Sequence, residues 1–189
     1  MHRDLSLEIV RVTEAAAIAS ASWTGKGNKN CADGAATTAM REVFSYVPFR
    51  GTVVIGEGEM DEAPMLYIGE AVGSGTGPEC DVAVDPLEGT EIVANGRNNA
   101  LSVVAIAEKG NLLHAPDMYM AKLAVGPRLA GKLSLNDPLE VTIHKAASLL
   151  HKEVSELTVS ILDRKRHAEQ IMLLRTLGVK IYLLSDGDV

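Results

Sequence analysis

Hydrophobic residues recur along the chain with two different periods, which predict helices in some segments and strands in others. In residues 5–22, apolar side chains come every three or four positions with polar residues between them, the spacing of an amphipathic helix. Two runs rich in β-branched residues, 51–55 and 82–84, predict buried strands, and residues 101–107 form a third apolar strand pattern. The first half of the chain therefore combines a packed helix with several short strands.

The segments between these runs are shorter and more mixed. Residues 35–44 predict a helix, residues 65–72 a short apolar strand, and residues 91–94 a short helix. Residues 73–78 form a glycine-rich connector that lacks the Gly-Lys-Ser/Thr ending of a phosphate loop and precedes no helix. Residues 112–114 predict the beginning of a further strand.

After residues 126–128, Gly-Pro-Arg, the pattern changes from strand-rich to strand, helix and strand. Residues 157–162 and 179–184 predict strands, and residues 168–177 predict a helix closed by Gly178. A unit of this kind brings both strand exits to one edge of a parallel sheet. We therefore expect an α/β chain.

Two lobes are expected, an N-terminal lobe of residues 1–128 and a second lobe of residues 129–189. The 189 residues are 47% hydrophobic, which is typical of a packed core and excludes a disordered or fibrous chain. A net charge of −7 argues against a nucleic-acid partner.

No apolar run is long enough for a transmembrane helix, and the N-terminus shows no secretory signal. Cys31 and Cys80 are too few for a disulfide framework. We expect a cytoplasmic protein without a membrane or nucleic-acid partner.

Two carboxylates directly follow the strand at 82–84. Asp85 falls at its carboxyl end, where open α/β sheets bind their ligands, and Pro86 is expected to end the strand because it lacks an N–H donor. Gly89 permits a tight turn that lets the backbone approach an anion. Glu88 can then turn back toward Asp85, so this segment is more typical of a metal site than of a capped turn with solvated acids.

A second acidic cluster follows the strand at 51–55, where Glu57, Glu59, Asp61 and Glu62 occur within six residues. The ordinary alternative is a solvated acidic loop. If the two clusters converge, their carboxylates repel one another unless a cation offsets the charge. Oxygen ligands select Mg²⁺ or Mn²⁺ over zinc.

Three consecutive cations, Arg164, Lys165 and Arg166, lie at the first strand exit of the second lobe, and Asp186 and Asp188 lie at the second exit. The cations could form a solvated loop that begins the next helix. Positive charge at a helix start opposes the macrodipole, however, and an anionic ligand would remove this conflict.

These motifs resemble the lithium-sensitive, inositol monophosphatase-like phosphatase superfamily, and more specifically class II fructose-1,6-bisphosphatase. The resemblance is carried by V-I-G-E-G-E-M-D-E-A-P-M-L-Y-I-G-E at 54–70 and D-V-A-V-D-P-L-E-G-T at 81–90. It also rests on G-K-G-N-K-N-C-A-D-G-A-A at 25–36, H-A-P-D-M-Y-M at 114–120 and the final S-D-G-D-V. It implies a layered α/β/α/β/α sugar-phosphatase fold and metal-dependent hydrolysis of the 1-phosphate of fructose-1,6-bisphosphate, a gluconeogenic reaction. Sedoheptulose-1,7-bisphosphate stays open as a second substrate.

The resemblance also implies roles for individual residues. It assigns Mn²⁺ or Mg²⁺ to the side chains of Asp33, Glu57, Asp85 and Glu88 and to the Leu87 carbonyl. Thr90 is implied to hydrogen-bond the attacking water, Asp61 or Asp33 to take its proton, and Lys29 to be a basic catalytic residue of the same site. The implied substrate-binding residues are Glu88, Gly89, Thr90, Tyr119, Arg164, Lys165, Arg166, Asp186, Gly187 and Asp188.

Simpler interpretations exist for three of these positions. Asp33 precedes the predicted helix at 35–44 and could be only its N-cap. Tyr119 could be a partly buried tyrosine with a satisfied hydroxyl. Lys165 stands where the family pattern has proline, which puts the shape of that loop in doubt.

Members of the family are longer than this chain, which ends at Val189. The resemblance places a further glutamate ligand and a substrate-contacting glycine beyond that point, so we expect an incomplete second lobe and severely reduced activity. One alternative is a weakly active or inactive metal-binding fragment. Another is a different inositol-phosphate-type phosphatase, although the D-M-Y-M and D-R-K-R segments favour the sugar bisphosphate. The family resemblance also implies a homo-oligomer, a dimer or a tetramer.

Overall fold

A computed structural model describes residues 3–57, 66–115 and 118–186 of the chain. The structure is mixed α/β, as predicted, and divides into two compact units, residues 1–117 and 118–188. The predicted lobe boundary after residue 128 stays a prediction.

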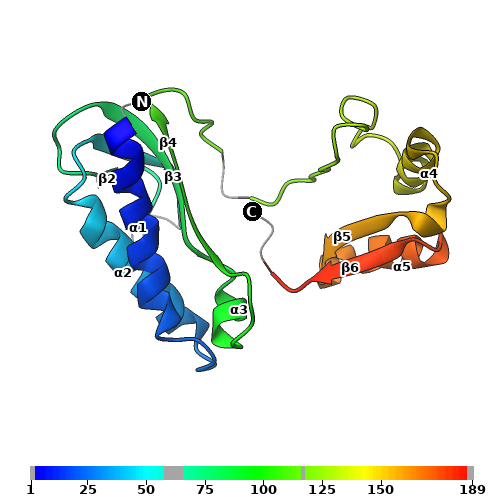
Figure 1. The fold of residues 1–189 in the computed structure, drawn as a ribbon, viewed down its shortest axis with the longest axis horizontal. Helices are drawn as coiled ribbons and strands as arrows, with labels where there is room; N and C mark the ends of the chain where they lie inside the picture. Colours follow the sequence, from blue (N-terminus) through cyan, green and yellow to red (C-terminus); the bar gives the residue numbers. More distant parts are fainter. Residues whose placement is uncertain (1–2, 58–65, 116–117, 187–189) are drawn as a thin grey trace. The chain divides into compact units, whose positions relative to one another are not determined.

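The first unit is built on a four-stranded sheet with the order β2-β1-β3-β4 (Figure 1). Its strands are β1 Arg50–Ile55, β2 Ala71–Val72, β3 Glu79–Glu88 and β4 Leu101–Glu108. β1 and β3 are parallel neighbours, while β2 and β4 pair antiparallel at either side. The β-branched and apolar runs therefore form strands as predicted, and β1 and β3 end at the same edge of the sheet.

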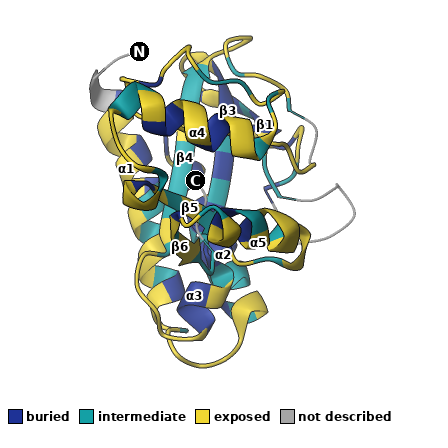
Figure 2. Ribbon diagram, turned by 90° about the vertical axis from the view of Figure 1, so that its right-hand side faces the viewer, coloured by how far each residue is buried: buried dark blue, intermediate teal, exposed yellow. Residues whose placement is uncertain are grey.

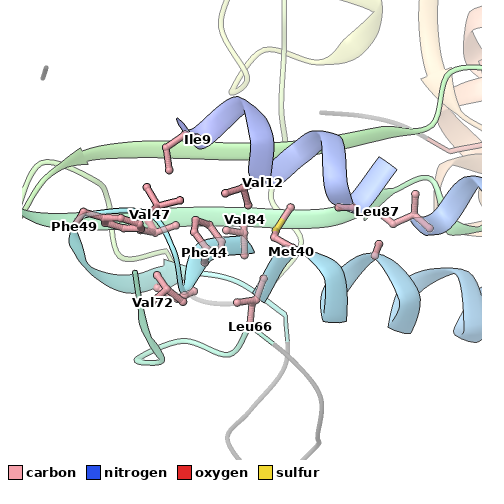
Figure 3. Close-up of a cluster of buried hydrophobic side chains, with 14 of the residues drawn as sticks. Ile9, Val12, Met40, Phe44, Val47, Phe49, Leu66, Val72, Val84 and Leu87 are labelled. Carbon is pink, nitrogen blue, oxygen red and sulfur yellow. The ribbon is translucent and has the colours of Figure 1, made fainter. Parts of the chain in front are cut away.

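Two long helices, α1 (Arg3–Ala21) and α2 (Lys29–Phe44), pack against one face of this sheet. Every third or fourth position of α1 is buried, and buried and exposed positions alternate along it in Figure 2. Figure 3 shows Val12 of α1, Phe44 of α2 and Val84 of β3 in the same hydrophobic cluster. Full burial of a side chain such as Phe44, which is 1% exposed, contributes about 2–3 kcal/mol.

The start of α2 differs from its prediction. The helix begins at Lys29, and the Asn28 side chain is its N-cap, accepting a hydrogen bond from the Cys31 N–H at 3.1 Å. Asp33 lies inside the helix, so the N-cap interpretation of Asp33 is wrong. Asn28, directly in front of the first helical turn, provides the same cap chemistry at an earlier position in the chain.

The expected end of β3 at Pro86 is also wrong, because the strand continues to Glu88. Asp85 pairs with Val103 of β4 and Glu88 pairs with Leu101, so β3 accommodates one extra residue in a bulge between them. A bulge tolerates proline, which lacks a backbone N–H, because the residue in the bulge does not have to donate a hydrogen bond to the neighbouring strand. The bulge keeps Asp85 and Glu88 on one strand while changing the direction of the backbone between them.

Of two other strand predictions, the one for residues 65–72 is correct only in part, and the one for residues 112–114 is wrong. Only residues 71–72 of the apolar segment at 65–72 form a strand, and residue 65 lies outside the described residues. Of the described residues between 109 and 115, none is in a strand. The backbone N–H groups of Gly110 and Leu112 instead donate to the buried carboxylate of Asp81, at 2.7 and 3.2 Å. The glycine-rich connector at 73–78 and the short helix α3 (Thr90–Ala94) agree with their predictions.

The second unit contains the predicted strand, helix and strand. β5 (Thr158–Leu162) and β6 (Lys180–Leu184) are parallel, and α5 (Ala168–Thr176) connects them. Gly178, with a φ of +79°, follows α5 as predicted. A helix without a counterpart in the predictions, α4 (Leu139–Leu150), covers this unit's core together with α5, whose Leu174 is 1% exposed. Two 3₁₀ turns, η1 (Val154–Glu156) and η2 (Lys165–His167), complete it.

Cys31 and Cys80, both within the described residues, form no disulfide. None of the helices in the described ranges has the length and apolar character that a membrane span requires.

Candidate metal and phosphate sites

The parallel pairing of β1 and β3 brings two acidic strand exits to one edge of the sheet. Ile55 of β1 pairs with Ala83 of β3. Glu57 and Asp85 each follow their paired residue by two positions, so they lie at the same level, Glu57 just after the end of β1 and Asp85 still within β3. This is the convergence that the sequence pattern predicts.

The pKa of Asp85 reflects the other carboxylates around it. Burial raises the pKa of Asp85 to about 8, and a side-chain hydrogen bond with Glu88 and the negative charges of Glu57 and Glu88 act in the same direction. The Leu87 N–H donates a hydrogen bond to Asp85 Oδ1 at 3.1 Å, which lowers this pKa and offsets part of the increase. The half-buried Asp85 is therefore close enough to Glu57 and Glu88 for their charges to favour a proton or a cation at this carboxylate.

The turn after these carboxylates depends on Gly89. Its φ of +92° lies in the left-handed region, which a residue with a side chain adopts only under strain. Gly89 is the N-cap of α3, so Thr90 becomes the first residue of that helix. Asp85, Glu88 and Thr90 lie within six residues of the sequence. The bulge changes the backbone direction between Asp85 and Glu88, and Gly89 turns the chain from β3 into α3.

The loop before α2 is held against α3 by backbone hydrogen bonds. The N–H groups of Gly25 and Gly27 donate to the carbonyls of Val93 and Ala94, both at 2.9 Å. Lys29 Nζ lies 2.9 Å from a carboxylate oxygen of Glu91, the residue after Thr90. The predicted catalytic lysine is therefore placed beside the start of α3, and Glu91 is a neighbour that the motif reading missed.

Asp33 lies one turn further along α2. Its Oδ1 atom is buried and has no hydrogen-bond partner among the described residues, and burial raises the pKa of this carboxyl group. A buried carboxylate oxygen without a partner is costly, and a cation is one group that would satisfy it.

The donor set fits a hard divalent cation. Asp33, Glu57, Asp85 and Glu88 offer only carboxylate oxygens, the ligands that Mg²⁺ and Mn²⁺ prefer. Among the described residues, no three His, Cys, Asp or Glu side chains are already arranged so that they could hold one ion. Of the predicted catalytic groups, Asp61 lies outside the described residues.

A second group of predicted residues meets in the second unit. Arg166 Cζ lies 4.2 Å from the centroid of the Tyr119 ring, a cation–π contact. Both residues line a cavity of about 620 Å³, which Lys122, His167 and Gln170 also line. His167 adjoins the D-R-K-R segment and accordingly could have been considered from the sequence. Tyr119 is 83% exposed, so the interpretation of a partly buried tyrosine is wrong.

Arg164 joins the two strand exits of the second unit. Its Nη2 atom lies 3.0 Å from Asp186 Oδ1, and its Nη1 donates to the Ser185 carbonyl. Lys165 is exposed in η2, while Gly187 and Asp188 lie outside the described residues. The basic segment therefore stands at the start of α5 as predicted, with one of its arginines engaged by the chain itself.

Comparison with known proteins gives consistent results. Over 189 residues the chain is 53% identical to fructose-1,6-bisphosphatase 1 class 2 of Escherichia coli, and the match covers 100% of this chain and 56% of the relative. A Synechococcus protein named D-fructose 1,6-bisphosphatase class 2/sedoheptulose 1,7-bisphosphatase is 50% identical over 201 residues, with 100% of this chain and 58% of the relative covered. Fructose-1,6-bisphosphatase class 2 of Haemophilus influenzae is 50% identical over 189 residues, with 57% of its length covered.

The chain thus spans just over half the length of these curated relatives. A profile of bacterial fructose-1,6-bisphosphatases encoded by glpX matches residues 3–189. The acidic residues at the carboxyl ends of β1 and β3, the basic strand exit and this match lead to one conclusion: the chain belongs to the family of bacterial, glpX-encoded fructose-1,6-bisphosphatases.

Proposed function

We propose that this chain carries the metal-dependent machinery that hydrolyses the 1-phosphate of fructose-1,6-bisphosphate to fructose-6-phosphate and phosphate. The observation that carries the proposal is the group of Glu57, Asp85 and Glu88, whose charges act on one another at the exits of two parallel strands. Sedoheptulose-1,7-bisphosphate is a second proposed substrate, since the name of the Synechococcus relative includes it.

Asp33, Glu57, Asp85, Glu88 and the Leu87 carbonyl would hold Mn²⁺ or Mg²⁺. When bound, the cation supplies positive charge at the phosphoryl group and makes a nearby water more acidic. Thr90 would orient the attacking water through its hydroxyl, and Asp61 or Asp33 would accept the proton. Lys29 would stabilise negative charge that develops on the phosphoryl oxygens.

Residues of the second unit would hold the distal end of the substrate. Arg166 and Tyr119 present a cation and a phenol at one cavity, and Arg164, Lys165 and Asp186 stand at the adjoining strand exits. Gly187 and Asp188 would complete the sugar contacts. Binding the remote phosphate orients the reacting end and lowers the entropic part of the barrier.

The architecture of the whole enzyme is part of the proposal. We propose a layered α/β/α/β/α sugar-phosphatase fold with lobes 1–128 and 129–189, a homo-oligomeric assembly and a cytoplasmic location. The preferred metal is proposed to be Mn²⁺ or Mg²⁺.

The test is phosphate release from fructose-1,6-bisphosphate with Mn²⁺ or Mg²⁺, measured on this chain and on Asp85→Ala, with the Escherichia coli relative as a positive control. Release by this chain that is lost in Asp85→Ala supports the proposal. Equal release by both proteins contradicts it.

One alternative is a metal-binding module that does not turn over. It predicts no phosphate release while Mn²⁺ still raises the melting temperature of this chain. A substrate panel that includes inositol 1-phosphate distinguishes the other alternative, an inositol-phosphate-type phosphatase.

A further inference from the structure

A short return segment, residues 66–70, lies against the end of β1. The Val53 N–H donates to the Glu70 carbonyl at 2.9 Å, and the Gly69 N–H donates to the Val53 carbonyl at 2.8 Å. The Glu57 N–H donates to the Leu66 carbonyl at 3.0 Å. The backbone that carries the Glu57 carboxylate is thus bonded directly to this segment.

The approach between the two backbones is close. A Cβ atom at Gly56 would collide with the Leu66 carbonyl oxygen and would come within 2.6 Å of Val53 Cγ1. Leu66 itself is 0% exposed and belongs to the hydrophobic core of the first unit. A shift of the return segment would therefore move the backbone at residues 56 and 57.

An ion pair between the buried Glu70 and the more exposed Arg41 holds this segment against α2. Glu70 is only 7% exposed, and its Oε1 atom lies 2.8 Å from Nε and 2.7 Å from Nη2 of Arg41 in the last turn of α2. Its other oxygen accepts a hydrogen bond from the Tyr67 N–H at 3.3 Å. A buried carboxylate needs this cation, because without it the charge is left unpaired in a poorly solvated place.

We propose that Arg41 and Glu70 are positioning residues for the metal site. They fix the return segment to α2, and the return segment fixes the backbone of Glu57. Because α2 also carries Asp33, the ion pair ties together two elements that supply proposed ligands. The inference rests on the proposed function for its metal readout, and neither residue would touch the metal or the substrate.

The experiment uses the whole chain and three variants. Glu70→Gln keeps the shape of the side chain but removes its charge, and Arg41→Lys keeps the charge but loses the paired donors. The matched control is Glu79→Gln, which removes exposed ion pairs with Arg50 (3.8 Å) and Lys109 (3.2 Å) at the other end of the same sheet.

Two quantities are measured, amide hydrogen exchange by NMR in the metal-free chain and Mg²⁺ affinity by calorimetry. In Glu70→Gln we expect the Glu57 amide to exchange about tenfold faster relative to the Val82 amide, and Mg²⁺ affinity to fall about tenfold, as it does when a ligand's supporting contact is lost. Arg41→Lys should give an intermediate change. Glu79→Gln should change neither quantity.

Glu57 exchange that is unchanged in Glu70→Gln overturns the inference. An equal acceleration at Glu57 and Val82 also overturns it, because the ion pair would then only stabilise the fold. If the unmodified chain binds no Mg²⁺, the metal part of the proposed function fails, and exchange at Glu57 decides the inference by itself.

Discussion

Lys29 and Glu91 form an ion pair of 2.9 Å that joins the first residue of α2 to the second residue of α3. The pair lies directly beside Thr90, the residue proposed to orient the attacking water. Both side chains are about half exposed, at 53% and 49%, so solvent screens their attraction. We therefore expect this pair to contribute less than about 1 kcal/mol to stability.

A substitution at each partner separates the catalytic role of Lys29 from its role in the ion pair. Lys29→Met should lower the rate of phosphate release about a hundredfold, the effect of losing a group that stabilises developing charge. Glu91→Gln breaks the same pair but keeps the ammonium group, and should retain most of the rate. Equal losses in the two variants would show that only the ion pair matters.

The raised pKa of Asp85 predicts a pH-dependent stability of the metal-free chain. Between pH 3.8 and about 8 the folded chain keeps a proton that the unfolded chain releases. The free energy of unfolding should therefore fall as the pH rises through this window, by up to about 1 kcal/mol per pH unit. Asp85→Asn should remove this contribution and be more stable than the unmodified chain at pH 8.

Urea unfolding with a chelator present, followed by the fluorescence of the single tryptophan, Trp23, measures this dependence. Trp23 packs against the core of the first unit and reports on its unfolding. Glu42→Gln, at an exposed position of α2, is the control and should keep the slope. A slope that Asp85→Asn leaves unaltered would contradict the assignment to Asp85.

The unpartnered oxygen of Asp33 predicts opposite effects of one substitution with and without metal. Without metal, Asp33→Ala should be about 0.5 kcal/mol more stable, because alanine is the better helix former and no buried charge remains. With Mn²⁺ at 100 times its dissociation constant, the unmodified chain should gain about 2.7 kcal/mol, and the variant less. Thermal unfolding with and without Mn²⁺ checks both effects, and equal stabilisation of the two proteins would exclude Asp33 as a ligand.

Gly89 and Gly110 provide a matched pair of substitutions in the left-handed region. Their φ values are +92° and +86°, and alanine at either position should cost about 1–2 kcal/mol through backbone strain. At Gly89 the new Cβ would also come within 2.9 Å of the flexible end of the Ile92 side chain, whereas at Gly110 it would meet no neighbour within 4 Å. Only Gly89 belongs to the turn that holds Asp85 and Glu88. Calorimetry should therefore show weaker Mn²⁺ binding for Gly89→Ala alone, and a similar loss in Gly110→Ala would attribute the effect to general destabilisation.

Those parts of the site that depend on local pattern could be predicted from the sequence. β-branched runs that end in acidic residues mark the exits of β1 and β3, and the strand, helix and strand pattern marks the parallel pair β5 and β6. These features require only side-chain periodicity and the residues next to each element's end.

The parts that failed depend on contacts between distant residues. Pro86 continues β3 because β4 pairs beyond it, and Leu112 leaves the strand conformation because the Asp81 carboxylate accepts its N–H. The start of α2 cannot be predicted from local propensity, because asparagine and aspartate are both good caps and Asn28 and Asp33 are both candidates. Arg41 and Glu70 are 29 positions apart, so no local pattern connects them.

The placement of Cys80 gives the chain a chemical reporter of its own. Cys80 is 3% exposed within β3, and burial, together with the nearby Glu108 and Asp81, raises the pKa of its thiol. Cys31, at the start of α2, is more accessible. A thiol reagent should therefore modify Cys31 in the folded chain, whereas modification of Cys80 requires β3 to separate from its neighbours. The rate of the second reaction measures how often the sheet that carries Asp85 opens.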